Sequence, residues 1–384
     1  MKVCFGTTAL ARSIAHGGVD GIGSYTRELG RALLARGTVE LIPAGYRAMV
    51  GGDVFPGAHL PVNLGRHSVM TTLGAVSPWT CLAEKELIAE RVDVFHATDH
   101  LIPKFSGIPV IATLMDAIPL SNPEWTTMRL AALRRWLLRR SGEWADHVIT
   151  ISEYSKQAIA EHFRIVPERI SVVPLGVHPR FLEQIDRTAR DEVLKRVGLP
   201  ARFFLCVGTL QPRKNLDRIL DAHSSLPAEL RREIPLIVVG RAGWGCESLV
   251  ARLRAIEAEG SVRWLEYLPD FDVRALMQAA SAVVFASLGE GFGLPVVEAF
   301  ASGLPVIASN TTSVPEVAGD AAVMVDPCNA GEIADAMRLV IDQPHMADAL
   351  RTAGLARARE LTWEACAEKT LAVYRSVLDG SCRR

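Results

Sequence analysis

Cysteine pairs spaced as Cys-x-x-Cys are absent from the 384-residue sequence, although seven cysteines are scattered along it. An odd number of cysteines without that spacing argues against a disulfide framework and against a zinc site. We therefore expect a protein of the reducing cytoplasm that uses no metal and no resident cofactor.

Long apolar runs and an excess of one charge are also absent. No stretch reaches the roughly 18 apolar residues of a membrane span, and the apolar run after Met1 is too short for a signal peptide. The 42 Lys and Arg residues balance the 43 Asp and Glu residues, so nothing points to a nucleic acid as partner. The sequence predicts a cytoplasmic protein that is neither exported nor embedded in a membrane.

The length of the chain exceeds what one hydrophobic core usually organises, so two domains are expected. Short apolar runs alternate with segments of helical period, a pattern typical of parallel sheets covered by helices. The pattern occurs twice and predicts an α/β fold of two Rossmann-like, doubly wound domains. The predicted strands are 2–6, 39–43, 92–97, 108–114, 147–151 and 170–174, then 202–208, 235–240, 261–266, 282–286, 304–308 and 321–325.

A segment with two prolines and one glycine, 173–179, interrupts both periodicities and is expected to link the domains. We place an N-terminal domain at 1–177 and a C-terminal domain at 178–362. Ligands of open α/β sheets bind at the carboxyl ends of the strands, so two such sheets facing each other would enclose a central cleft.

The most informative segment is 287–299, in which a glycine-rich loop follows an apolar strand and precedes a helix. Gly291 and Gly293 let backbone amides approach a ligand closely, and the helix start attracts anions such as a pyrophosphate. Glu290 at the rim of the loop and Glu298 on the helix frame it with two carboxylates. A plain strand-to-helix turn does not need such a pair, so the segment indicates a binding site.

A second segment, 208–215, again follows a strand and precedes a helix. Its Arg213 supplies a planar fork and its Lys214 a point charge, the usual combination for the oxygens of a diphosphate. An adjacent Arg and Lys are often merely solvated, but their place at a strand end beside a glycine turn favours a phosphate site.

These motifs resemble those of the family-four retaining glycosyltransferases. Glu290 and Glu298, eight positions apart around Gly-Phe-Gly-Leu-Pro, resemble the E-x7-E signature, and 208–215 resembles the phosphate-binding segment. Further similar segments are 21–29, 150–156 and the terminal helical segment 363–384, which in the family crosses back to the first domain. The resemblance covers nearly the whole chain and implies the GT-B fold.

The resemblance also implies a role for each motif residue. Arg213 and Lys214 would bind the diphosphate, Glu290 the hydroxyls of the donor sugar, and Glu298 the ribose. The implied donor-binding set is Gly21, Gly23, Thr209, Arg213, Lys214, Tyr267, Leu268, Glu290, Gly291, Phe292, Gly293, Leu294 and Glu298, with Arg213, Lys214 and Glu290 as catalytic residues. The co-substrate would be a nucleotide sugar, with GDP-sugars favoured over UDP-sugars.

A charge argument supports the same roles without the resemblance. Departure of the sugar leaves extra negative charge on the nucleoside diphosphate, so fixed cations on its phosphates lower the barrier. Family members are thought to use a front-face route through an oxocarbenium-like state, so no enzymic nucleophile is expected.

Asp270 and Asp272 imitate a metal-binding Asp-x-Asp pair, but we interpret them as helix caps and expect no metal.

Met115 departs from the family pattern, because many relatives have His where this chain has Met115 before Asp116. That His is usually placed near the 6-hydroxyl of the donor sugar, and Met cannot donate a strong hydrogen bond there. A 6-deoxy donor such as rhamnose has no 6-hydroxyl and would lose no hydrogen bond at Met115. The alternative is that Met115 only packs.

His96 lies at another strand end, where it would contact the acceptor or serve as a hydrogen-bonded structural His.

The segment 129–140 combines five arginines with leucines and a tryptophan, and no acidic residue follows until Glu143. Such a basic amphipathic helix would rest on an anionic membrane surface. The alternative is a helix that packs its leucines on the sheet and keeps its arginines in water. The expected acceptor, a glycan or a lipid-linked oligosaccharide, fits peripheral contact with the inner membrane surface.

Other functions stay open at this point. A nucleotide-sugar epimerase or hydrolase on the same fold, and a non-catalytic glycan-binding protein, are the alternatives to a mannosyl- or rhamnosyltransferase of surface polysaccharide synthesis. A glycosidase would also use two carboxylates, but it needs no phosphate site. A nicotinamide-dependent oxidoreductase is disfavoured because the glycines of 17–23 do not follow the Gly-x-Gly-x-x-Gly register.

Overall fold

The computed structural model describes residues 1–47, 50–51, 53–77, 81, 83–125 and 131–380. Contacts within the chain divide it into two compact units: Met1–Gly176 with Trp363–Arg384 form unit 1, and Val177–Thr362 form unit 2. Within the described ranges, no helix combines the length and the apolar character that crossing a membrane requires.

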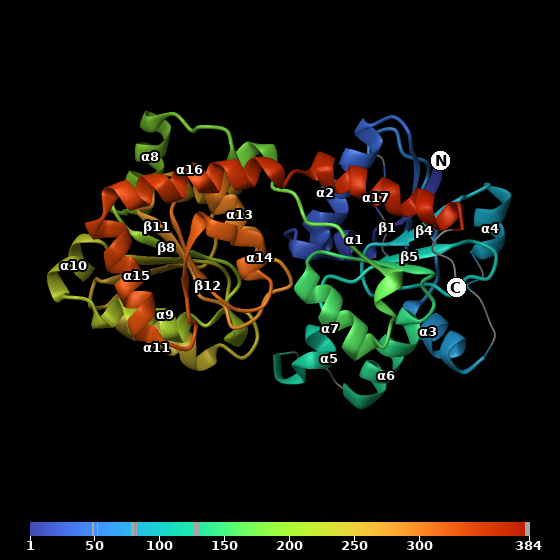
Figure 1. Ribbon diagram of the computed structural model, residues 1–384, viewed down its shortest axis with the longest axis horizontal. Coiled ribbons are helices and arrows are strands. Elements are labelled where there is room, and N and C mark those ends of the chain that lie inside the picture. The colour runs from blue at the N-terminus through green and yellow to red at the C-terminus, as the bar shows by residue number, and fades with distance from the viewer. Residues whose placement is uncertain (48–49, 52, 78–80, 82, 126–130, 381–384) are drawn as a thin grey trace. The chain divides into compact units, whose positions relative to one another are not determined.

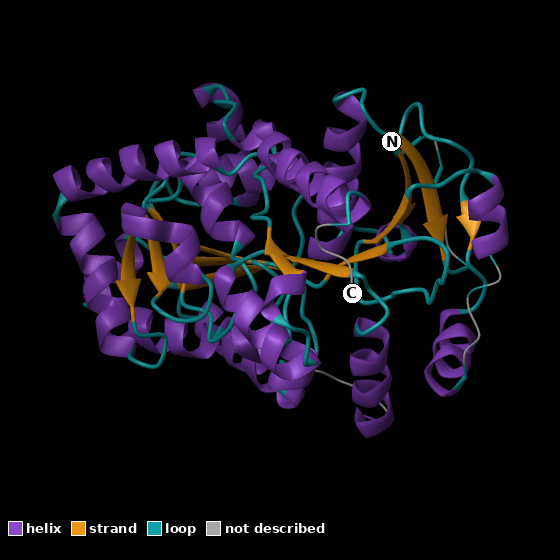
Figure 2. Ribbon diagram, turned by 45° about the vertical axis from the view of Figure 1, so that its right-hand side comes forward, coloured by secondary structure: helices purple, strands orange, loops and turns teal. Residues whose placement is uncertain are grey.

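Unit 1 is built on a parallel sheet in the strand order β3-β2-β1-β4-β5-β6-β7. Figure 1 labels its strands β1, β4 and β5, and Figure 2 shows the strands in orange. The chain leaves β1 towards β2 and later returns to the other side of β1 with β4, which is the switch point of a doubly wound sheet. The strands are β1 Lys2–Gly6, β2 Glu40–Gly45, β3 Val62–Asn63, β4 Val94–Ala97, β5 Val110–Thr113, β6 His147–Thr150 and β7 Ile170–Val172.

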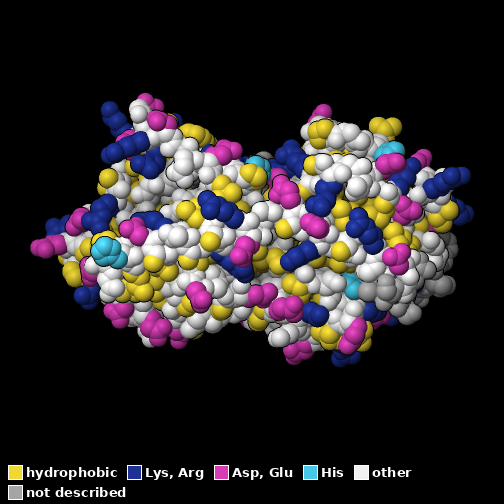
Figure 3. Space-filling view, turned by 45° about the horizontal axis from the view of Figure 1, so that its top comes forward, with side chains coloured by type: hydrophobic (Ala, Val, Ile, Leu, Met, Phe, Trp, Pro, Cys, Tyr) yellow, Lys and Arg dark blue, Asp and Glu magenta, His cyan; other side chains and the backbone are white. Residues whose placement is uncertain are grey.

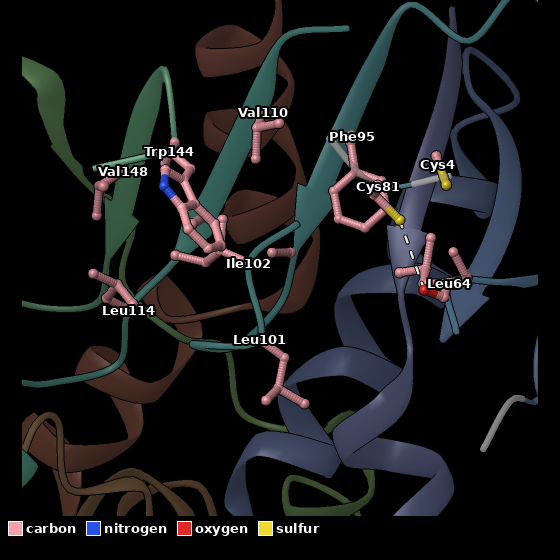
Figure 4. Close-up of a cluster of buried hydrophobic side chains, with 14 of the residues drawn as sticks. Cys4, Leu64, Cys81, Phe95, Leu101, Ile102, Val110, Leu114, Trp144 and Val148 are labelled. Carbon is pink, nitrogen blue, oxygen red and sulfur yellow. Dashed lines mark hydrogen bonds between the residues drawn. The ribbon is translucent and has the colours of Figure 1, made fainter. Parts of the chain in front are cut away.

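Helices cover this sheet. They are α1 Thr8–Ala15, α2 Gly21–Ala35, α3 His67–Val76, α4 Glu84–Ala89, α5 Ile118–Ser121, α6 Ala131–Gly142, α7 Glu153–Phe163 and α17 Trp363–Leu378, with the short 3-10 helices η1 Pro123–Trp125 and η2 Pro167–Arg169. Strands β4, β5 and β6 are buried throughout, as expected for strands covered on both faces. Figure 4 shows part of this core, with Phe95, Val110, Val148 and Trp144 among its side chains.

A buried polar network fixes the terminal helix α17 within unit 1. Tyr374 on α17 and the Nδ1 of His96 on β4 lie 2.6 Å apart in a hydrogen bond. The hydroxyl groups of Tyr25 on α2 and Thr113 on β5 share another hydrogen bond of 2.7 Å. Buried hydrogen bonds of this kind specify one packing arrangement, because a wrong one would leave polar atoms without partners. Residues 381–384 of the predicted terminal segment lie outside the described residues.

Unit 2 has its own parallel sheet in the order β10-β9-β8-β11-β12-β13. The strands are β8 Phe204–Val207, β9 Leu236–Val239, β10 Val262–Leu265, β11 Ala282–Phe285, β12 Val306–Ser309 and β13 Ala322–Val325. Its helices are α8 Arg187–Val197, α9 Leu216–Ser225, α10 Ala228–Glu233, α11 Glu247–Glu257, α12 Asp270–Ala279, α13 Leu294–Ala301, α14 Val314–Ala318, α15 Ala330–Asp342 and α16 Pro344–Glu360, and its 3-10 helices are η3 Pro179–Phe181, η4 Pro212–Lys214 and η5 Gly319–Ala321.

The predicted pair of doubly wound α/β domains is confirmed. Each predicted strand overlaps an observed one, whereas the strand β3 was not predicted. It pairs through only two residues, Val62 and Asn63, and so carries no alternation that a sequence could reveal. On the face shown in Figure 3, basic and acidic side chains are interspersed with apolar ones, which agrees with the balanced composition.

Candidate functional site

The carboxyl edge of the unit 2 sheet gathers the two motifs singled out in the sequence. Segment 208–215 follows β8, the glycine loop 286–293 follows β11, and these two strands are neighbours. Because parallel strands end at the same edge, the loops meet there. The backbone N–H of Leu288 donates to the carbonyl of Arg213 (2.8 Å), which joins the two loops directly.

Three charged side chains form the centre of the site. The carboxylate of Glu290 accepts a hydrogen bond from Nη1 of Arg213 (2.7 Å) and another from Nζ of Lys214 (2.6 Å). Arg213 also donates to the carbonyl of Gly289 (3.0 Å). The Glu290 side chain is only 8% exposed. The triad of Arg213, Lys214 and Glu290 thus carries two cations around one buried anion, a net charge of +1.

Asn215 holds the cations in place. It adopts a left-handed conformation with φ +58° at the start of α9, a region that Asn tolerates better than most residues. Its side-chain amide donates to the carbonyls of Ala286 (2.8 Å) and Pro327 (2.7 Å). The turn carrying Arg213 and Lys214 is therefore tied to two neighbouring loops, which fixes the cations before any ligand arrives.

The environment sets the charge state of the triad. Burial alone would raise the pKa of Glu290, but the attraction of Lys214 and Arg213 outweighs it and lowers the pKa. Burial lowers the pKa of Lys214, against the opposing pull of Glu290. The ammonium lies 5.0 Å from the ring centroid of Phe285, where a cation is attracted to the aromatic face. Glu290 is therefore ionised at neutral pH.

The glycine loop leads into α13 through a residue with a positive φ angle. Gly293 has φ +106°, a conformation that other residues rarely adopt. Two residues of the segment between β12 and α14 hold the loop: the Glu290 N–H donates to Thr312 Oγ1 (3.2 Å), and the Ser313 hydroxyl donates to the Glu290 carbonyl (2.9 Å). In the described structure α13 has no side-chain cap hydrogen bond. An uncapped helix start offers N–H groups to an anion.

Glu298 lies on α13, partly exposed, near a second pair of charges. Burial is the main reason why the pKa of Glu298 rises to about 7; the positive charge of Arg180 lowers it and the negative charge of Asp270 raises it further. Arg180 donates from Nη2 to Asp270 at 3.0 Å. The two carboxylates of the E-x7-E motif therefore differ in charge behaviour, with Glu290 ionised and Glu298 titrating near neutrality.

An arginine and a tyrosine are stacked at the outer strands of the same edge. The guanidinium of Arg241, after β9, lies 4.8 Å from the ring centroid of Tyr267, after β10. The Leu210 N–H donates to the Arg241 carbonyl (2.9 Å), so the stack adjoins the phosphate-type segment. Tyr267 is 63% exposed, Thr209 is exposed, and Leu268 is half-buried. Exposed planar groups at this place can stack on a flat ligand ring.

Unit 1 carries the other predicted residues. Met115 and Asp116 follow β5 and are both partly exposed; the Asp116 carboxylate accepts from the Ile118 N–H (3.0 Å). Gly21 and Gly23 open α2, and the N–H of Gly23 donates to the carboxylate of Asp20 (2.7 Å). That amide is already used in capping the helix. A Cβ on Gly23 would lie 3.0 Å from Val19, so close packing also accounts for the glycine.

The acceptor contact predicted for His96 is wrong, and its structural alternative holds. His96 is fully buried, and its ring nitrogens are bonded to Tyr374 and, at 2.7 Å, to Thr113. Burial lowers its pKa to about 3, so it stays neutral at physiological pH.

The prediction that Asp270 and Asp272 cap a helix is also wrong. No side-chain hydrogen bond caps α12. Each aspartate pairs with an arginine instead, Asp272 with Arg196 at 2.5 Å and Asp270 with Arg180. Across the part of the chain that the structure describes, no group of three or more His, Cys, Asp or Glu is arranged to hold a metal. Independence from metal stays a prediction.

Comparison with known proteins agrees with this geometry. The model of Glycosyltransferase Family 4 matches residues 19–181, and that of Glycosyl transferases group 1 matches residues 190–357. O-antigen chain mannosyltransferase B of Escherichia coli is 31% identical over 265 residues, 69% of this chain and 70% of that protein. The chain belongs to glycosyltransferase family 4.

A second relative of this family-4 glycosyltransferase is a mannosyltransferase too. Serotype-specific mannosyltransferase WbdA of Escherichia coli is 31% identical over 69% of the chain, which spans only 33% of that longer protein. Among solved structures, sucrose-phosphate synthase from Thermosynechococcus elongatus superposes with a TM-score of 0.74 over 99% of this chain and 100% of that one, at 18% identity. WaaG, a glycosyltransferase involved in lipopolysaccharide biosynthesis, gives 0.70 over 97% and 99%, at 19% identity. The glycosyltransferase has the GT-B fold.

Several residues of the glycosyltransferase site were not predicted from its sequence. Asn215 ends the segment 208–215 and received no role, although an Asn directly after Arg-Lys at a helix start is a signal for a left-handed turn. Arg241, Arg180, Thr312 and Ser313 stand in no recognisable spacing with the motifs they support. Folding alone brings them to the site.

The raised pKa of Glu298 predicts a pH-dependent cost to stability. Between about pH 4.5 and pH 7 the folded protein keeps the Glu298 proton, whereas the unfolded chain releases it. The contribution of this proton to the free energy of unfolding is therefore complete below about pH 4.5 and is lost as pH rises through about 7. We expect Glu298→Gln to raise the free energy of unfolding by about 1–3 kcal/mol at pH 8.5, with little change at pH 4.5. Thermal unfolding at several pH values measures it.

The exposed Glu229, on α10, gives the matched control for this prediction. Glu229→Gln should show no such dependence on pH. Equal pH profiles for Glu298→Gln and the wild type would contradict the raised pKa of Glu298.

Proposed function

We propose that this glycosyltransferase transfers mannose or rhamnose from a GDP-sugar to a glycan or a lipid-linked oligosaccharide, with retention of configuration, in surface polysaccharide synthesis. The observation that carries the proposal is the buried Arg213–Lys214–Glu290 triad beside the uncapped start of α13. Its mannosyltransferase relatives support the sugar and the pathway.

The triad suits the departure of a nucleoside diphosphate. As the glycosidic bond to phosphate breaks, negative charge grows on the leaving diphosphate and positive charge on the sugar. Arg213 and Lys214 stabilise the first charge, together with the N–H groups at the start of α13. Glu290 faces the second as a fixed anion. Because two cations already bind Glu290, it makes a poor nucleophile, which supports a route without an enzyme-linked sugar.

The nucleoside has a matching place along the same sheet edge. From β11 to β10 there are three strand spacings, about 14 Å in all, comparable to an extended nucleoside diphosphate. With the diphosphate at the triad, Glu298 would accept hydrogen bonds from ribose hydroxyls. The stacked Arg241 and Tyr267 would meet the base, and an arginine fork suits the O6 and N7 acceptors of guanine.

Product analysis tests the proposal. The protein is incubated with isotopically labelled GDP-mannose and a panel of mannosides, and the products are separated by mass and by anomeric configuration. An α-linked disaccharide supports retaining transfer. Free mannose alone would mean a hydrolase, a labelled epimer an epimerase, and unchanged donor a non-catalytic binding protein. In parallel, thermal shift against GDP and UDP identifies the base, because a ligand of the native state raises its apparent stability.

We expect the transfer to need no metal, because fixed cations already offset the charge of the diphosphate. Turnover should be unchanged after exhaustive treatment with EDTA. Loss of turnover in EDTA that a divalent ion restores would refute this.

Met115 predicts donor choice. A site that hydrogen-bonds a hydroxyl rejects the analogue lacking it by about 10⁴ or more, whereas an apolar site rejects an added hydroxyl only weakly. We therefore expect GDP-rhamnose to be used at least as well as GDP-mannose, and Met115→His to shift the ratio of kcat/KM towards mannose. Competition between the two donors measures the ratio. A wild type for which GDP-rhamnose is inert would show that Met115 only packs.

A lipid-linked acceptor lies in a membrane, so transfer to it requires the protein to work at the membrane surface. Peripheral contact through the 129–140 segment is part of this proposal. Residues 129 and 130 lie outside the described residues, whereas α6 carries the rest of the segment.

A further inference from the structure

Helices α3 and α6 pack against each other in unit 1. Figure 1 shows both at the lower edge of this unit. They are far apart in sequence, so no single segment of the chain reveals the surface that they form together. We name it the α3–α6 surface.

Helix α3 exposes apolar side chains that a soluble helix normally buries. Val69 is 47% exposed, Leu73 44% and Val76 70%. Their spacing of four and three residues places them on one face of the helix. The row lies along one side of α3 and contains no charged residue.

Helix α6 adds apolar and basic groups. Leu133 is 51% exposed and Trp136 46%, again one turn apart on one face. Arg134 is exposed and Arg135 is partly exposed; neither has an ion-pair partner among the described residues. Farther along, Arg139 donates to the carbonyl of His162 (2.8 Å), and Arg140 pairs with Glu143.

Acidic residues are missing from both parts of the chain that build this surface. None occurs between Asp53 and Glu84 or between Glu124 and Glu143. Elsewhere the surface is mixed, as the face in Figure 3 illustrates. A protein whose charges balance overall thus concentrates unpaired positive charge and exposed apolar groups on two adjacent helices.

We propose that the α3–α6 surface docks on an anionic lipid bilayer, with its arginines at the headgroups and Trp136, Leu133 and the apolar row of α3 at the boundary with the acyl chains. Tryptophan among arginines suits this interface, because its ring is apolar and its N–H is polar. A second copy of the chain fits less well, since a two-fold contact would bring the two rows of arginines together.

The proposal rests on the peripheral contact proposed above and deepens it, because it adds α3 to the surface and names the anionic lipids that the surface meets. Docking itself needs neither donor nor acceptor. The test is cosedimentation of the protein with vesicles of phosphatidylcholine alone and of phosphatidylcholine mixed with phosphatidylglycerol. We expect binding only to the anionic vesicles, weakened by salt. Each basic residue near such a surface contributes roughly a fivefold factor to partitioning. Reversing two charges in Arg134→Glu/Arg135→Glu should therefore lower binding about 25-fold or more.

Two further variants complete the test. Leu133→Ser/Trp136→Ser should weaken binding with the charges intact, and Arg187→Glu/Arg254→Glu, on exposed arginines of unit 2, should bind like the wild type. Wild type that ignores anionic vesicles, or binds neutral ones equally, overturns the proposal. The proposal is also overturned if the wild type sediments as a dimer and only the variants of the α3–α6 surface sediment as monomers. GDP thermal shifts on the same samples show whether the donor site is intact, so a failure of docking is distinct from a failure of the proposed function.

Discussion

Lys214→Ala is expected to lower kcat/KM about a hundredfold or more, as removal of other groups that stabilise transition-state charge does. The Lys214 ammonium lies 2.6 Å from the Glu290 carboxylate and is only 19% exposed, so it is held in place before the donor binds. A fixed cation needs no reorganisation when negative charge develops on the leaving diphosphate. Its loss should therefore appear mainly in kcat.

The fold should survive this substitution. Lysine side chains usually lie in solvent, whereas the structure buries most of Lys214. Arg213 still neutralises Glu290 when Lys214 is removed, so we expect a loss of only about 1–3 kcal/mol in the free energy of unfolding.

Steady-state kinetics with a saturating acceptor, beside thermal unfolding, checks the prediction for Lys214. Lys195→Ala, which removes an exposed lysine from α8 of the same unit, is the matched control and should behave as wild type. If the folded Lys214→Ala variant kept the turnover of the wild type, Lys214 would not touch the reacting diphosphate.

The fold was predictable because its information is local. A short apolar run indicates each strand, and apolar residues repeating with the helical period indicate each helix. The sequence therefore predicts β4 to β6 and β8 to β13 to within a few residues. Right-handed crossovers restrict how such an alternation can be wound, but they do not decide at which strand the order reverses, which in unit 1 is β1. Strand β3 was not predicted, because its two residues are too few to show an alternation of apolar and polar side chains.

The site was predictable only in part, because its contacts join distant segments. The motifs placed Glu290 and Lys214 at the ends of neighbouring strands, but nothing in a spacing of 76 residues tells that they form an ion pair. The sequence left two roles open for His96 for the same reason: its partner Tyr374 lies 278 residues away. The aspartates of α12 resembled caps locally, while Arg180 and Arg196 reach them from other segments.

Glu290→Gln is expected to change turnover and product binding in opposite directions. In the free protein the Glu290 carboxylate lies between Arg213 and Lys214, where it competes with a diphosphate for the same two cations. Replacing it with a neutral amide raises the local net charge from +1 to +2. One additional unit of positive charge a few ångströms from a phosphate strengthens binding by about fivefold to tenfold at this degree of exposure. We therefore expect tighter binding of GDP, weakened again by salt.

Turnover should nevertheless fall about a hundredfold, because the developing positive charge on the sugar loses its facing anion. Calorimetry with GDP and steady-state kinetics on one preparation separate the two effects. Glu290→Asp keeps the charge but shortens its reach, so it should leave GDP affinity nearer to that of the wild type. Weaker GDP binding by Glu290→Gln would mean that Glu290 orients the cations for the diphosphate and does not compete with it. Tighter GDP binding together with slower turnover is expected only if Glu290 has two roles. It must compete with the diphosphate for Arg213 and Lys214, and it must also face the positive charge that develops on the sugar.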